Sequence, residues 1–395
     1  MLAKWDRKPI GELCDFGNGY GFKASDWSER GLPIIRIQNL NGVREFNYFD
    51  GPPPREQIVV NPGELLFAWA GVKGVSFGPK IWSGPKGLLN QHIYKITPRK
   101  GVDPFWLYST LRVITSKIEA SAHGFKSSLL HVKKADIADQ VVPVPTLDEQ
   151  QAISQTLSTW DRAIEKTVAL IAAKERRKAG LMQRLLTGKV RFGEFAGEAW
   201  KEVPLGTLFE PVTDTVGDKD IPPYSISAGI GFVSQREKWG KDIAGRQYAS
   251  YTHLRKGEFA YNKGNSKKYQ CGCAYLLRDQ DEISVPNVFI SFRPKSDKVS
   301  ADFYEHFFVA DYHARELKRY ITSGARSDGL LNLNKKDFFK INVPCPSPRE
   351  QEAIAKVLNA AVAEIDEHRN QLAALKEQKK GLMQQLLTGK VRVKS

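Results

Sequence analysis

Apolar residues in two stretches of the chain follow the spacing of an α-helix that buries one face. The later stretch repeats them in steps of three, four and seven, at Ile354, Leu358, Ala361, Ile365, Leu372, Leu375, Leu382 and Leu386. The earlier stretch carries Ile153, Leu157, Trp160, Ile164, Ile171, Leu181 and Leu185, with Thr167, Lys174 and Lys178 interrupting the series. Such steps form a heptad seam. They predict a long helix over about residues 148–187 and a second within 348–395, each ending at a Thr-Gly pair whose glycine can adopt the left-handed cap.

The rest of the chain, residues 1–146 and 192–347, predicts strands. These two segments, called the fronts below, are rich in Gly, Pro, aromatic and β-branched residues, and turn signals such as N-G-V and N-P-G-E separate short apolar runs. Each front is thus predicted to be an α/β globule on a twisted or barrel-like sheet. Strands are expected at 33–40, 64–71, 92–98, 257–264, 273–279 and 286–294, and short helices near 104–120 and 301–320.

The helical phrases are copies of each other. G-L-M-Q-R-L-L-T-G-K-V-R from Gly180 and G-L-M-Q-Q-L-L-T-G-K-V-R from Gly381 agree at eleven of twelve positions, 201 residues apart. V-P-V-P-T-L-D-E-Q-Q-A-I and V-P-C-P-S-P-R-E-Q-E-A-I recur upstream at the same offset, and W-D-R-K-P-I-G-E-L from Trp5 is similar to W-K-E-V-P-L-G-T-L from Trp200. A fixed internal period indicates a tandem repeat. The chain therefore reads as two units with divergent fronts and constant backs.

The predicted domains are the front 1–146, a helical spacer 147–191, the front 192–347 and a helical spacer 348–395. A single exposed helix of about 40 residues would be marginally stable, so each long helix needs a partner along its seam. We predict an α+β fold of two α/β globules, each followed by a long helix, with the helices pairing as an antiparallel coiled coil with pseudo-two-fold symmetry. Such a helix is roughly 60 Å long, which matches about 18 base pairs of duplex. The helices are interpreted as a spacer between two readers of one DNA.

The composition favours a polyanionic partner. Lys and Arg number 59 against 44 Asp and Glu, a net charge of +15, which is typical of nucleic-acid binding. Four cysteines do not make a disulfide framework, and the C-G-C at 271–273 has no second pair at zinc-ligand spacing. There is no apolar run long enough for a membrane span and no signal-peptide core. The sequence is interpreted as a soluble, intracellular protein; the resemblance described below implies the cytoplasm of a bacterium or archaeon.

Loops of both fronts carry basic and amide side chains interleaved with aromatic residues. Lys and Arg can anchor phosphates, and Asn, Gln and Arg can read base edges. The segment Y-N-K-G-N-S-K-K-Y-Q, residues 261–270, is the densest of these loops. His92, in contrast, is interpreted as a core histidine. The predicted DNA contacts are Arg36, Gln38, Asn39, Lys73, Gln91, Lys126, Ser127, Asn262, Lys263, Asn265, Lys267, Lys268 and Arg326.

Two fragments resemble catalytic loops. D-F-G-N-G-Y-G, residues 15–21, is similar to the glycine-rich loop of S-adenosylmethionine methyltransferases, and D-I-P-P-Y, residues 220–224, to the (Asp/Asn)-Pro-Pro-Tyr loop of adenine-N6 methyltransferases. The first lacks the required order of strand, loop and helix, and Ile221 stands where the acceptor of the amino group should be. No ATP phosphate loop is present. We expect no catalytic residue and no metal site. An adenine-N6 DNA methyltransferase, or a coiled-coil scaffold without sequence-specific DNA binding, are the alternatives.

Taken together, these phrases resemble the DNA specificity subunit of type I restriction–modification enzymes, which act in host defence. The two P-x-P…E-Q-x-x-I phrases are similar to the family's entrance to each constant helix, and L-M-Q-R-L-L-T-G-K-V-R to its helix end. G-L-P-I-I-R-I-Q-N-L, G-E-L-L-F-A-W-A-G and Q-Y-A-S-Y-T-H-L-R-K-G-E-F-A-Y-N-K-G-N-S resemble its recognition domains. The resemblance, over nearly all of the chain, implies that each front is a target-recognition domain for one half of a split, asymmetric DNA site.

The resemblance also implies partners. Two methyltransferase subunits that carry S-adenosylmethionine would grip the helices, and restriction/translocase subunits that use ATP and Mg would join them, while this chain binds no cofactor. A related subunit that serves a fused methyltransferase–nuclease is an alternative. The residues expected to face the partner subunits are Gln150, Ile153, Leu157, Trp160, Gln351, Ile354, Leu358 and Ile365.

Overall fold

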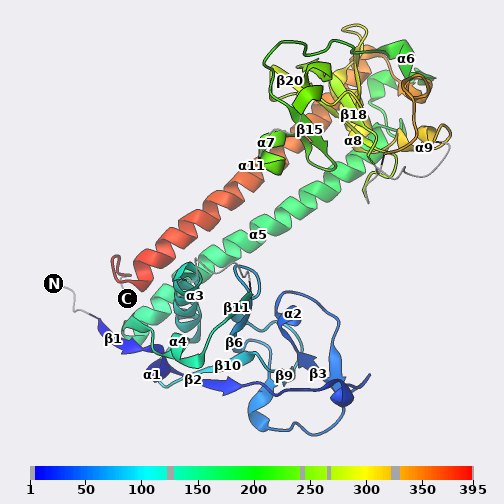
Figure 1. The fold of residues 1–395 in the computed structure, drawn as a ribbon. Coiled ribbons are helices and arrows are strands. Elements are labelled where there is room, and N and C mark those ends of the chain that lie inside the picture. The colour runs from blue at the N-terminus through cyan, green and yellow to red at the C-terminus, as the bar shows by residue number, and fades with distance from the viewer. Residues whose placement is uncertain (1–4, 122–128, 241–244, 265–267, 322–329, 394–395) are drawn as a thin grey trace. The chain divides into compact units, whose positions relative to one another are not determined.

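The computed structural model describes residues 5–121, 129–240, 245–264, 268–321 and 330–393. They form two compact units: residues 1–168 with 370–395, and residues 169–369 (Figure 1). Each unit holds one front together with parts of both long helices. The predicted boundaries after residues 146, 191 and 347 fall inside these units, because the helix ends pack onto the fronts.

The first unit is built on two four-stranded sheets. Its elements are β1 (Asp6–Pro9), α1 (Ile10–Leu13), β2 (Cys14–Asn18), β3 (Leu32–Ile35), α2 (Ile37–Leu40), β4 (Asn47–Phe49), β5 (Val59–Val60), β6 (Leu65–Ala68), β7 (Ala70–Val72), β8 (Gly78–Ile81), β9 (Gly87–Leu89), β10 (Ile93–Pro98), α3 (Pro104–Ser121), β11 (Leu129–His131), α4 (Lys134–Ala138), β12 (Val141–Val144) and the start of α5 (Leu147–Leu185). One sheet is antiparallel, in the order β2-β10-β6-β8; the other has the order β4-β3-β9-β5, with β3 parallel to β9. The ladders β1-β12 and β7-β11 complete the unit.

The second unit has one four-stranded sheet and three two-stranded ladders. Its elements are the rest of α5, β13 (Lys201–Pro204), α6 (Leu205–Leu208), β14 (Phe209–Pro211), β15 (Tyr224–Ser227), β16 (Gly231–Ser234), α7 (Gln235–Trp239), β17 (Thr252–Arg255), β18 (Phe259–Asn262), β19 (Cys273–Leu276), β20 (Glu282–Val285), β21 (Ile290–Pro294), α8 (Ala301–Val309), α9 (Ala314–Leu317), α10 (Lys335–Phe338), β22 (Asn342–Cys345) and the start of α11 (Pro348–Leu387). The sheet order is β14-β21-β18-β19, and the ladders are β13-β22, β15-β16 and β17-β20.

The two fronts share one plan despite their divergent sequences. β2-β10-β6-β8 in the first unit corresponds in order to β14-β21-β18-β19 in the second, and β1-β12 corresponds to β13-β22. In each front a helix, α3 or α8, follows the strand β10 or β21 and buries aromatic or aliphatic residues in the core of the sheet. The fronts differ in their remaining strands: the first unit has the sheet β4-β3-β9-β5, and the second has the ladders β15-β16 and β17-β20.

Most of the predicted strands and helices are present. The expected strands at 92–98, 257–264 and 273–279 contain β10, β18 and β19, and the one at 64–71 contains β6 and most of β7. The expected strand at 33–40 is wrong in its second half, because the chain turns into α2 where Asn39 Oδ1 accepts the Arg36 N–H at 2.9 Å. The strand expected at 286–294 begins only at Ile290, and the helix expected at 301–320 is broken into α8 and α9 at Asp311, which has a φ of 61°.

The two long helices match their prediction closely. α5 has 39 residues and α11 has 40, and both are followed by a glycine in the left-handed region, Gly188 with a φ of 67° and Gly389 with a φ of 73°. The first turns of each helix are buried in the core of the front that precedes it: Ile153 and Leu157 in the first unit, and the corresponding residues of α11 in the second. Among the helices of the described segments, none has the length and apolar character needed to cross a bilayer.

In the first unit the repeated phrases converge on Glu149. The carboxylate of Glu149, 5 % exposed, accepts a hydrogen bond from Trp5 Nε1 at 2.8 Å and forms a bidentate ion pair with Arg392. The Arg392 guanidinium also lies 4.7 Å from the centroid of the Trp5 ring, and a Cβ on Gly389 would come within 3.1 Å of that ring. The start of the chain, the start of α5 and the phrase that ends α11 thus form one cluster.

The second unit repeats this cluster with its own three residues. Glu350, fully buried, accepts from Trp200 Nε1 at 2.8 Å and from Arg191 Nε and Nη2 at 2.8 and 2.6 Å. Hydrogen bonding to Glu350 raises the pKa of Arg191. Arg191 ends the phrase after α5, whereas Glu350 begins α11. In both units, therefore, the phrase after one long helix clamps the first turn of the other, and we call these clusters the Trp-Glu-Arg clamps.

The glutamine after each clamp glutamate joins the long helix to its front. Gln150 Nε2 donates to the Pro145 carbonyl at 3.0 Å, and its Oε1 accepts the N–H of Asp103, which caps α3. Gln351 does the same in the second unit: it donates to the carbonyl of Pro346 at 2.9 Å and accepts the N–H of Ser300, the N-cap of α8, at 2.9 Å. The Pro-x-Pro and Glu-Gln parts of the repeat therefore act together as a joint, in which the glutamine bonds the long helix to the front.

Candidate nucleic-acid interface

In the first unit the described ends of two predicted DNA loops are paired. β7 pairs with β11 so that Val72 lies opposite Leu129. Lys73 follows Val72 directly, and Leu129 is the first described residue after segment 122–128. Lys126 and Ser127 belong to that segment and lie outside the described residues. Because Leu129 pairs with Val72, the residue that follows segment 122–128 nevertheless lies next to Lys73, which is half-buried.

The second unit brings together the corresponding pair of loops. Gly264 forms a bridge with Leu330, and the Leu331 N–H donates to the Lys263 carbonyl at 3.0 Å. The residue before segment 265–267 and the residue after segment 322–329 are therefore paired. The predicted contacts Asn265, Lys267 and Arg326 lie in these segments, outside the described residues. The sequence named both loops, but no local pattern in it indicates that Gly264 and Leu330 pair.

The remaining predicted contacts of this second loop line its described ends. Asn262 Oδ1 accepts the Gly264 N–H at 2.8 Å and Nδ2 donates to the Ile226 carbonyl at 3.4 Å. Lys263 Nζ donates to the carbonyl of Leu333 at 3.4 Å. Asn262 and Lys263 are thus half-buried and tied to the loop's own backbone. Their side chains hold the backbone at the ends of the loop and do not extend far into solvent.

Lys268 is the exposed cation at this place. Its ammonium lies 5.3 Å from the centroid of the Tyr269 ring, which is itself 2 % exposed. The ring therefore helps to position the ammonium of this exposed residue, an arrangement suited to a phosphate contact.

Arg36 and Gln38 stand at the turn after β3. The Arg36 guanidinium lies 5.5 Å from the centroid of the Trp27 ring, and Nη1 donates to Asn47 Oδ1 at 3.1 Å. Arg36 is half-buried and Gln38 is exposed, and their role as DNA contacts stays a prediction.

Asn39 occupies a different position from the one predicted. Its side chain is 6 % exposed. Its Oδ1 accepts the Arg36 N–H, and its Nδ2 donates to the carbonyls of Val43 and Glu45 at 3.1 and 2.9 Å. These bonds use both ends of the amide to close the turn, so we remove Asn39 from the DNA contacts.

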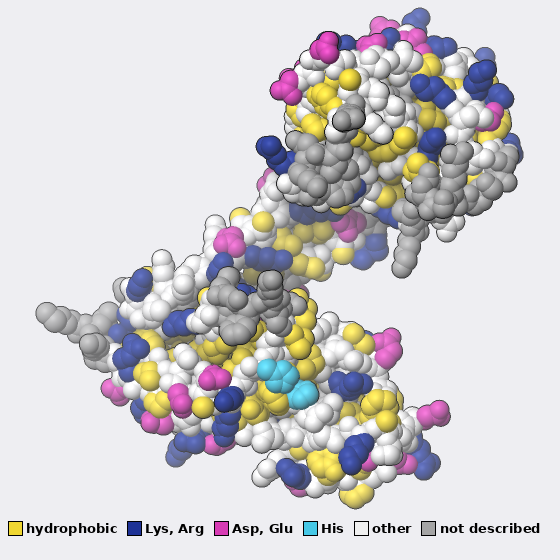
Figure 2. All heavy atoms as spheres, in the orientation of Figure 1, with side chains coloured by type: hydrophobic (Ala, Val, Ile, Leu, Met, Phe, Trp, Pro, Cys, Tyr) yellow, Lys and Arg dark blue, Asp and Glu magenta, His cyan; other side chains and the backbone are white. Residues whose placement is uncertain are grey.

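The structure also groups the rings of Trp69, His92 and His131, which the sequence did not bring together. Gln91 is exposed, and next to it His92 has a φ of 73° and is half-buried rather than part of the core. The His92 ring contacts Trp69 and His131. Burial and then the charge of His131 lower the pKa of His92. Figure 2 shows two histidine side chains next to each other on the face of the first unit. Only the β7-β11 pairing, which the sequence did not reveal, brings His131 to this place.

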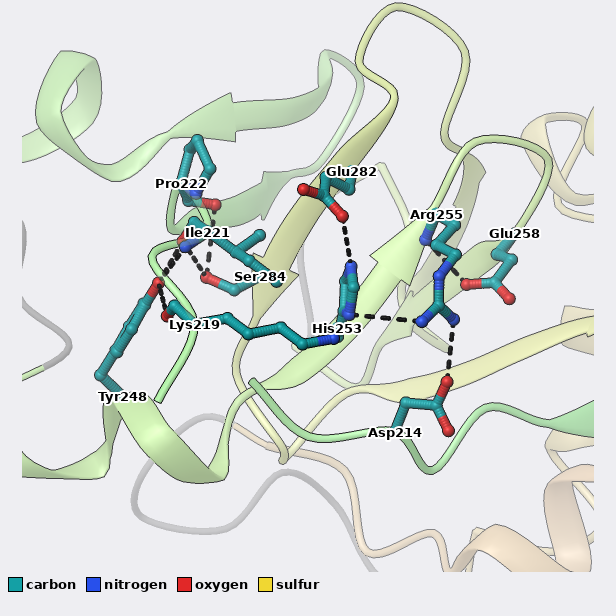
Figure 3. A network of polar contacts seen from close by, with 10 residues as sticks. All are labelled: Asp214, Lys219, Ile221, Pro222, Tyr248, His253, Arg255, Glu258, Glu282 and Ser284. Atoms are coloured by element: carbon teal, nitrogen blue, oxygen red, sulfur yellow. Dashed lines mark hydrogen bonds and ion pairs between the residues drawn. The ribbon is translucent and has the colours of Figure 1, made fainter. Parts of the chain in front are cut away.

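The D-I-P-P-Y segment serves the fold. Figure 3 shows that the Tyr248 hydroxyl accepts the Ile221 N–H at 2.5 Å and donates to the Ile221 carbonyl at 2.6 Å. Ser284 Oγ donates to the carbonyls of Ile221 and Pro222 at 3.1 and 3.3 Å. These bonds tie the segment to β20 and to the turn that holds Tyr248. Ile221, where a methyltransferase needs its amino-group acceptor, is 2 % exposed.

A second polar network joins the β17-β20 ladder to the chain before β15 (Figure 3). Arg255 Nη1 bonds to Asp214 Oδ2 at 2.8 Å, and buried His253 bonds through Nε2 to Glu282 Oε2 at 2.8 Å. Glu258 accepts the Arg255 N–H at 2.8 Å. The bond from Arg255 lowers the pKa of Asp214 and raises that of Arg255. Arg255 therefore stabilises the fold by linking β17 to the chain before β15. The described residues hold no group of three or more His, Cys, Asp or Glu placed to bind a metal ion.

The residues expected to face partner subunits lie mostly inside this chain. Trp160 is half-buried. The others are between 0 and 3 % exposed: Gln150, Ile153, Leu157, Gln351, Ile354, Leu358 and Ile365. Buried side chains hold the long helices to their own fronts, so contact with a partner would fall to their exposed neighbours. The partner role itself stays a prediction.

Comparison with known proteins gives a consistent family. Residues 3–172 and 246–377 match the family described as Type I restriction modification DNA specificity domain. The type I restriction enzyme MjaVIII specificity subunit of Methanocaldococcus jannaschii is 26 % identical over 367 residues, which cover 86 % of this chain and 82 % of that protein. The type I restriction enzyme EcoBI specificity subunit of Escherichia coli is 22 % identical over 396 residues, which cover 92 % of this chain and 80 % of that protein.

Two solved structures share the fold. The type I restriction–modification S subunit of M. genitalium has a TM-score of 0.56 at 17 % identity, covering 98 % of this chain and 96 % of that one. A chain from a structural study of complex assembly and conformational transition of the type I R-M system has a TM-score of 0.62 at 15 % identity, covering 99 % of both. Since the family match takes in most of both fronts and parts of both long helices, the chain belongs to the type I restriction–modification DNA specificity family.

Proposed function

We propose that this chain is the subunit that chooses the DNA target of a type I restriction–modification enzyme, and that each front reads one half of a split, asymmetric site. The observation that carries the proposal is the repeated sheet plan. In both units the chain just after the equivalent strand, β6 or β18, pairs with a residue that follows a second loop: Val72 with Leu129, and Gly264 with Leu330. A constant scaffold with different loops suits two readers of different sequences.

The two long helices set the gap between the half-sites. In this proposal α5 and α11 pair as an antiparallel coiled coil with pseudo-two-fold symmetry, and 39 residues give a length of about 58 Å. Ion pairs between helix parts within each unit support the pairing: Lys379 with Asp161 in the first unit, and Arg369 with Glu175 in the second. The two clamps support opposite directions, because each joins the end of one helix to the start of the other.

The chain acts together with catalytic partners. We infer that two methyltransferase subunits bind the helices and supply S-adenosylmethionine, and that restriction/translocase subunits use ATP and Mg. This chain holds no cofactor and carries out no chemistry. The names of the relatives, specificity subunits of type I restriction enzymes, support this division of labour.

The alternatives are weaker. An adenine-N6 methyltransferase would need D-I-P-P-Y open to a flipped base, and that segment is bonded to Tyr248 and Ser284 instead. A scaffold without DNA binding would need neither the excess of 15 positive charges nor two different loop sets on one plan.

The test is a chain in which the second front, residues 192–347, is replaced by a copy of residues 1–146. The chain is assembled with its methyltransferase subunits, and methylated sites are mapped in cells. The expected site holds the first half-site twice, in inverted orientation, with the gap retained. An assembled complex that still methylates the original asymmetric site would refute the assignment of half-sites to fronts.

A further inference from the structure

A cluster of rings lies at the surface of the first unit. Trp69 stands between β6 and β7, and its ring centroid is 4.8 Å from that of His92 and 5.3 Å from that of His131, with both imidazoles nearly perpendicular to it. The two imidazoles are 5.6 Å apart. Tyr94 stacks on Trp69 at 5.8 Å. The indole thus holds both imidazoles in fixed positions.

The backbone fixes the same arrangement. The Trp69 N–H donates to the His92 carbonyl at 3.0 Å, and the Trp69 carbonyl accepts the Val132 N–H at 3.0 Å. His131 lies opposite Ala70 in the β7-β11 ladder. His92 is held at a φ of 73°. This backbone conformation is energetically unfavourable for a residue with a Cβ, and proteins keep it mainly at functional sites.

The charges around the cluster leave room for an anion. In the described part of the chain neither His92 nor His131 is ion-paired with a carboxylate, and the charge that acts on His92 is that of His131. Burial raises the pKa of Tyr94, which stays neutral. The cationic side chains on the adjoining elements are Lys73 after β7 and Lys133 and Lys134 after β11, whereas Lys95 on β10 is paired with Glu64 at 2.9 Å. The carboxylates that contact these elements already accept backbone hydrogen bonds: Glu119 from the Gly74 N–H and Asp136 from the Lys133 N–H. Two imidazoles among lysines and without a counter-ion favour a negatively charged ligand.

We propose that Trp69, His92 and His131 form part of the DNA contact of the first unit, with the two imidazoles donating hydrogen bonds to phosphate oxygens of the duplex and Trp69 positioning them. This inference rests on the proposed DNA-binding function and names the chemistry of one contact within it. Exposed Gln91 precedes His92, and Lys73 stands at the end of the β7-β11 ladder, so the contact is continuous with the predicted ones.

The contact makes DNA affinity depend on pH. A phosphate beside an imidazole raises its pKa, so binding takes up protons. In the free protein the pKa of His92 lies below the ordinary 6.5. The added affinity is complete below the pKa of the free protein and is lost as the pH rises through the higher pKa of the complex. Between pH 8 and 5.5 the affinity should therefore rise as pH falls, by up to about tenfold per pH unit for each proton taken up.

The experiment measures the affinity of the chain, assembled with its methyltransferase subunits, for a duplex that carries the sequence that this complex methylates. Kd is determined between pH 8 and pH 5.5 at constant ionic strength for the wild type and for His92→Asn with His131→Gln. Asparagine tolerates positive φ, and glutamine keeps a hydrogen-bond donor without charge. His131→Gln alone, at an exposed position, is the second variant, and His368→Asn on α11 in the second unit is the matched control.

We expect the wild type and His368→Asn to bind more tightly as pH falls, and the double variant to lose most of that dependence. His131→Gln should lose part of it. Equal pH dependence in wild type and both cluster variants would overturn the histidine contact and leave the proposed function intact. Wild-type chain that shows no preference for the methylated sequence would overturn both.

Discussion

The clamp of the first unit gives the sharpest prediction about stability. Arg392→Met removes the guanidinium and keeps the apolar stem, which leaves the Glu149 carboxylate with the single hydrogen bond from Trp5 Nε1. Breaking a buried ion pair by removing one partner costs about 3–5 kcal/mol. The Arg392 side chain is 22 % exposed and that of Glu149 is 7 % exposed, so water offsets part of the cost. We expect a loss of about 2–3 kcal/mol.

That loss can be measured on the full chain by differential scanning calorimetry. For a unit of this size each kcal/mol lowers Tm by about 2–4 °C, so the first unit should melt about 4–12 °C earlier. Hydrogen exchange assigns the shifted transition to the first unit. Lys390→Met is the matched control, since Lys390 is exposed two residues away and should change stability by less than about 0.5 kcal/mol.

A second substitution separates charge from packing. In the Arg392→Met chain, Glu149→Gln removes the unpaired buried charge and should restore about 1 kcal/mol. If Arg392→Met behaved like Lys390→Met, the clamp would not stabilise the unit. If Glu149→Gln lowered stability further, the loss would come from packing, and the reasoning from a buried charge would be wrong.

Three further predictions concern the second unit. Gln351→Ala removes the acceptor of the Ser300 N–H and should cost about 1–3 kcal/mol in urea unfolding; a neutral result would contradict its role as a joint. Burial raises the pKa of Asp311 to about 6, so its stabilising contribution is complete below the ordinary 3.8 and is lost as pH rises through 6. Because the Asp311 side chain is 32 % exposed, water reduces the effect. Asp311→Asn should therefore stabilise the unit by about 1–2 kcal/mol at pH 7.5 and hardly at all near pH 4, and an equal effect at both values would disprove it. Lys268→Ala should lower the salt dependence of DNA binding by about one unit of slope, whereas Lys256→Ala, in the turn before β18, should not; identical slopes would exclude Lys268 from the contact.

Regular elements with strong local signals were predictable from the sequence. The heptad steps placed α5 and α11 to within about a turn, and the glycine caps at 188 and 389 were confirmed by their φ values. The offset of 201 residues revealed the tandem units. Short elements decided by one side-chain bond were not predictable: at 37–40 the Asn39 cap turns an apolar, strand-like run into a helix.

Contacts between distant parts of the chain were beyond the sequence. Glu149 meets a tryptophan 144 positions earlier and an arginine 243 positions later, and no local pattern indicates such a pairing. The same holds for the candidate site. Loop composition named Lys73 and Gln91, but only the β7-β11 ladder shows that His131 joins them. Conversely, the repeat of Gln150 and Gln351 suggested a partner surface, whereas their bonds are internal to each unit.

The central claim is that two fronts read one split site across a gap set by the long helices. Its most direct test inserts four residues between Val168 and Ala169 in α5 and four between Arg369 and Asn370 in α11, and maps methylated sites in cells that carry the complex. Four residues add about 6 Å of helix, close to two base pairs at 3.4 Å each. We predict two unchanged half-sites separated by a gap that is one or two base pairs longer. An unchanged gap with unchanged affinity, or a single unsplit motif, would contradict the account.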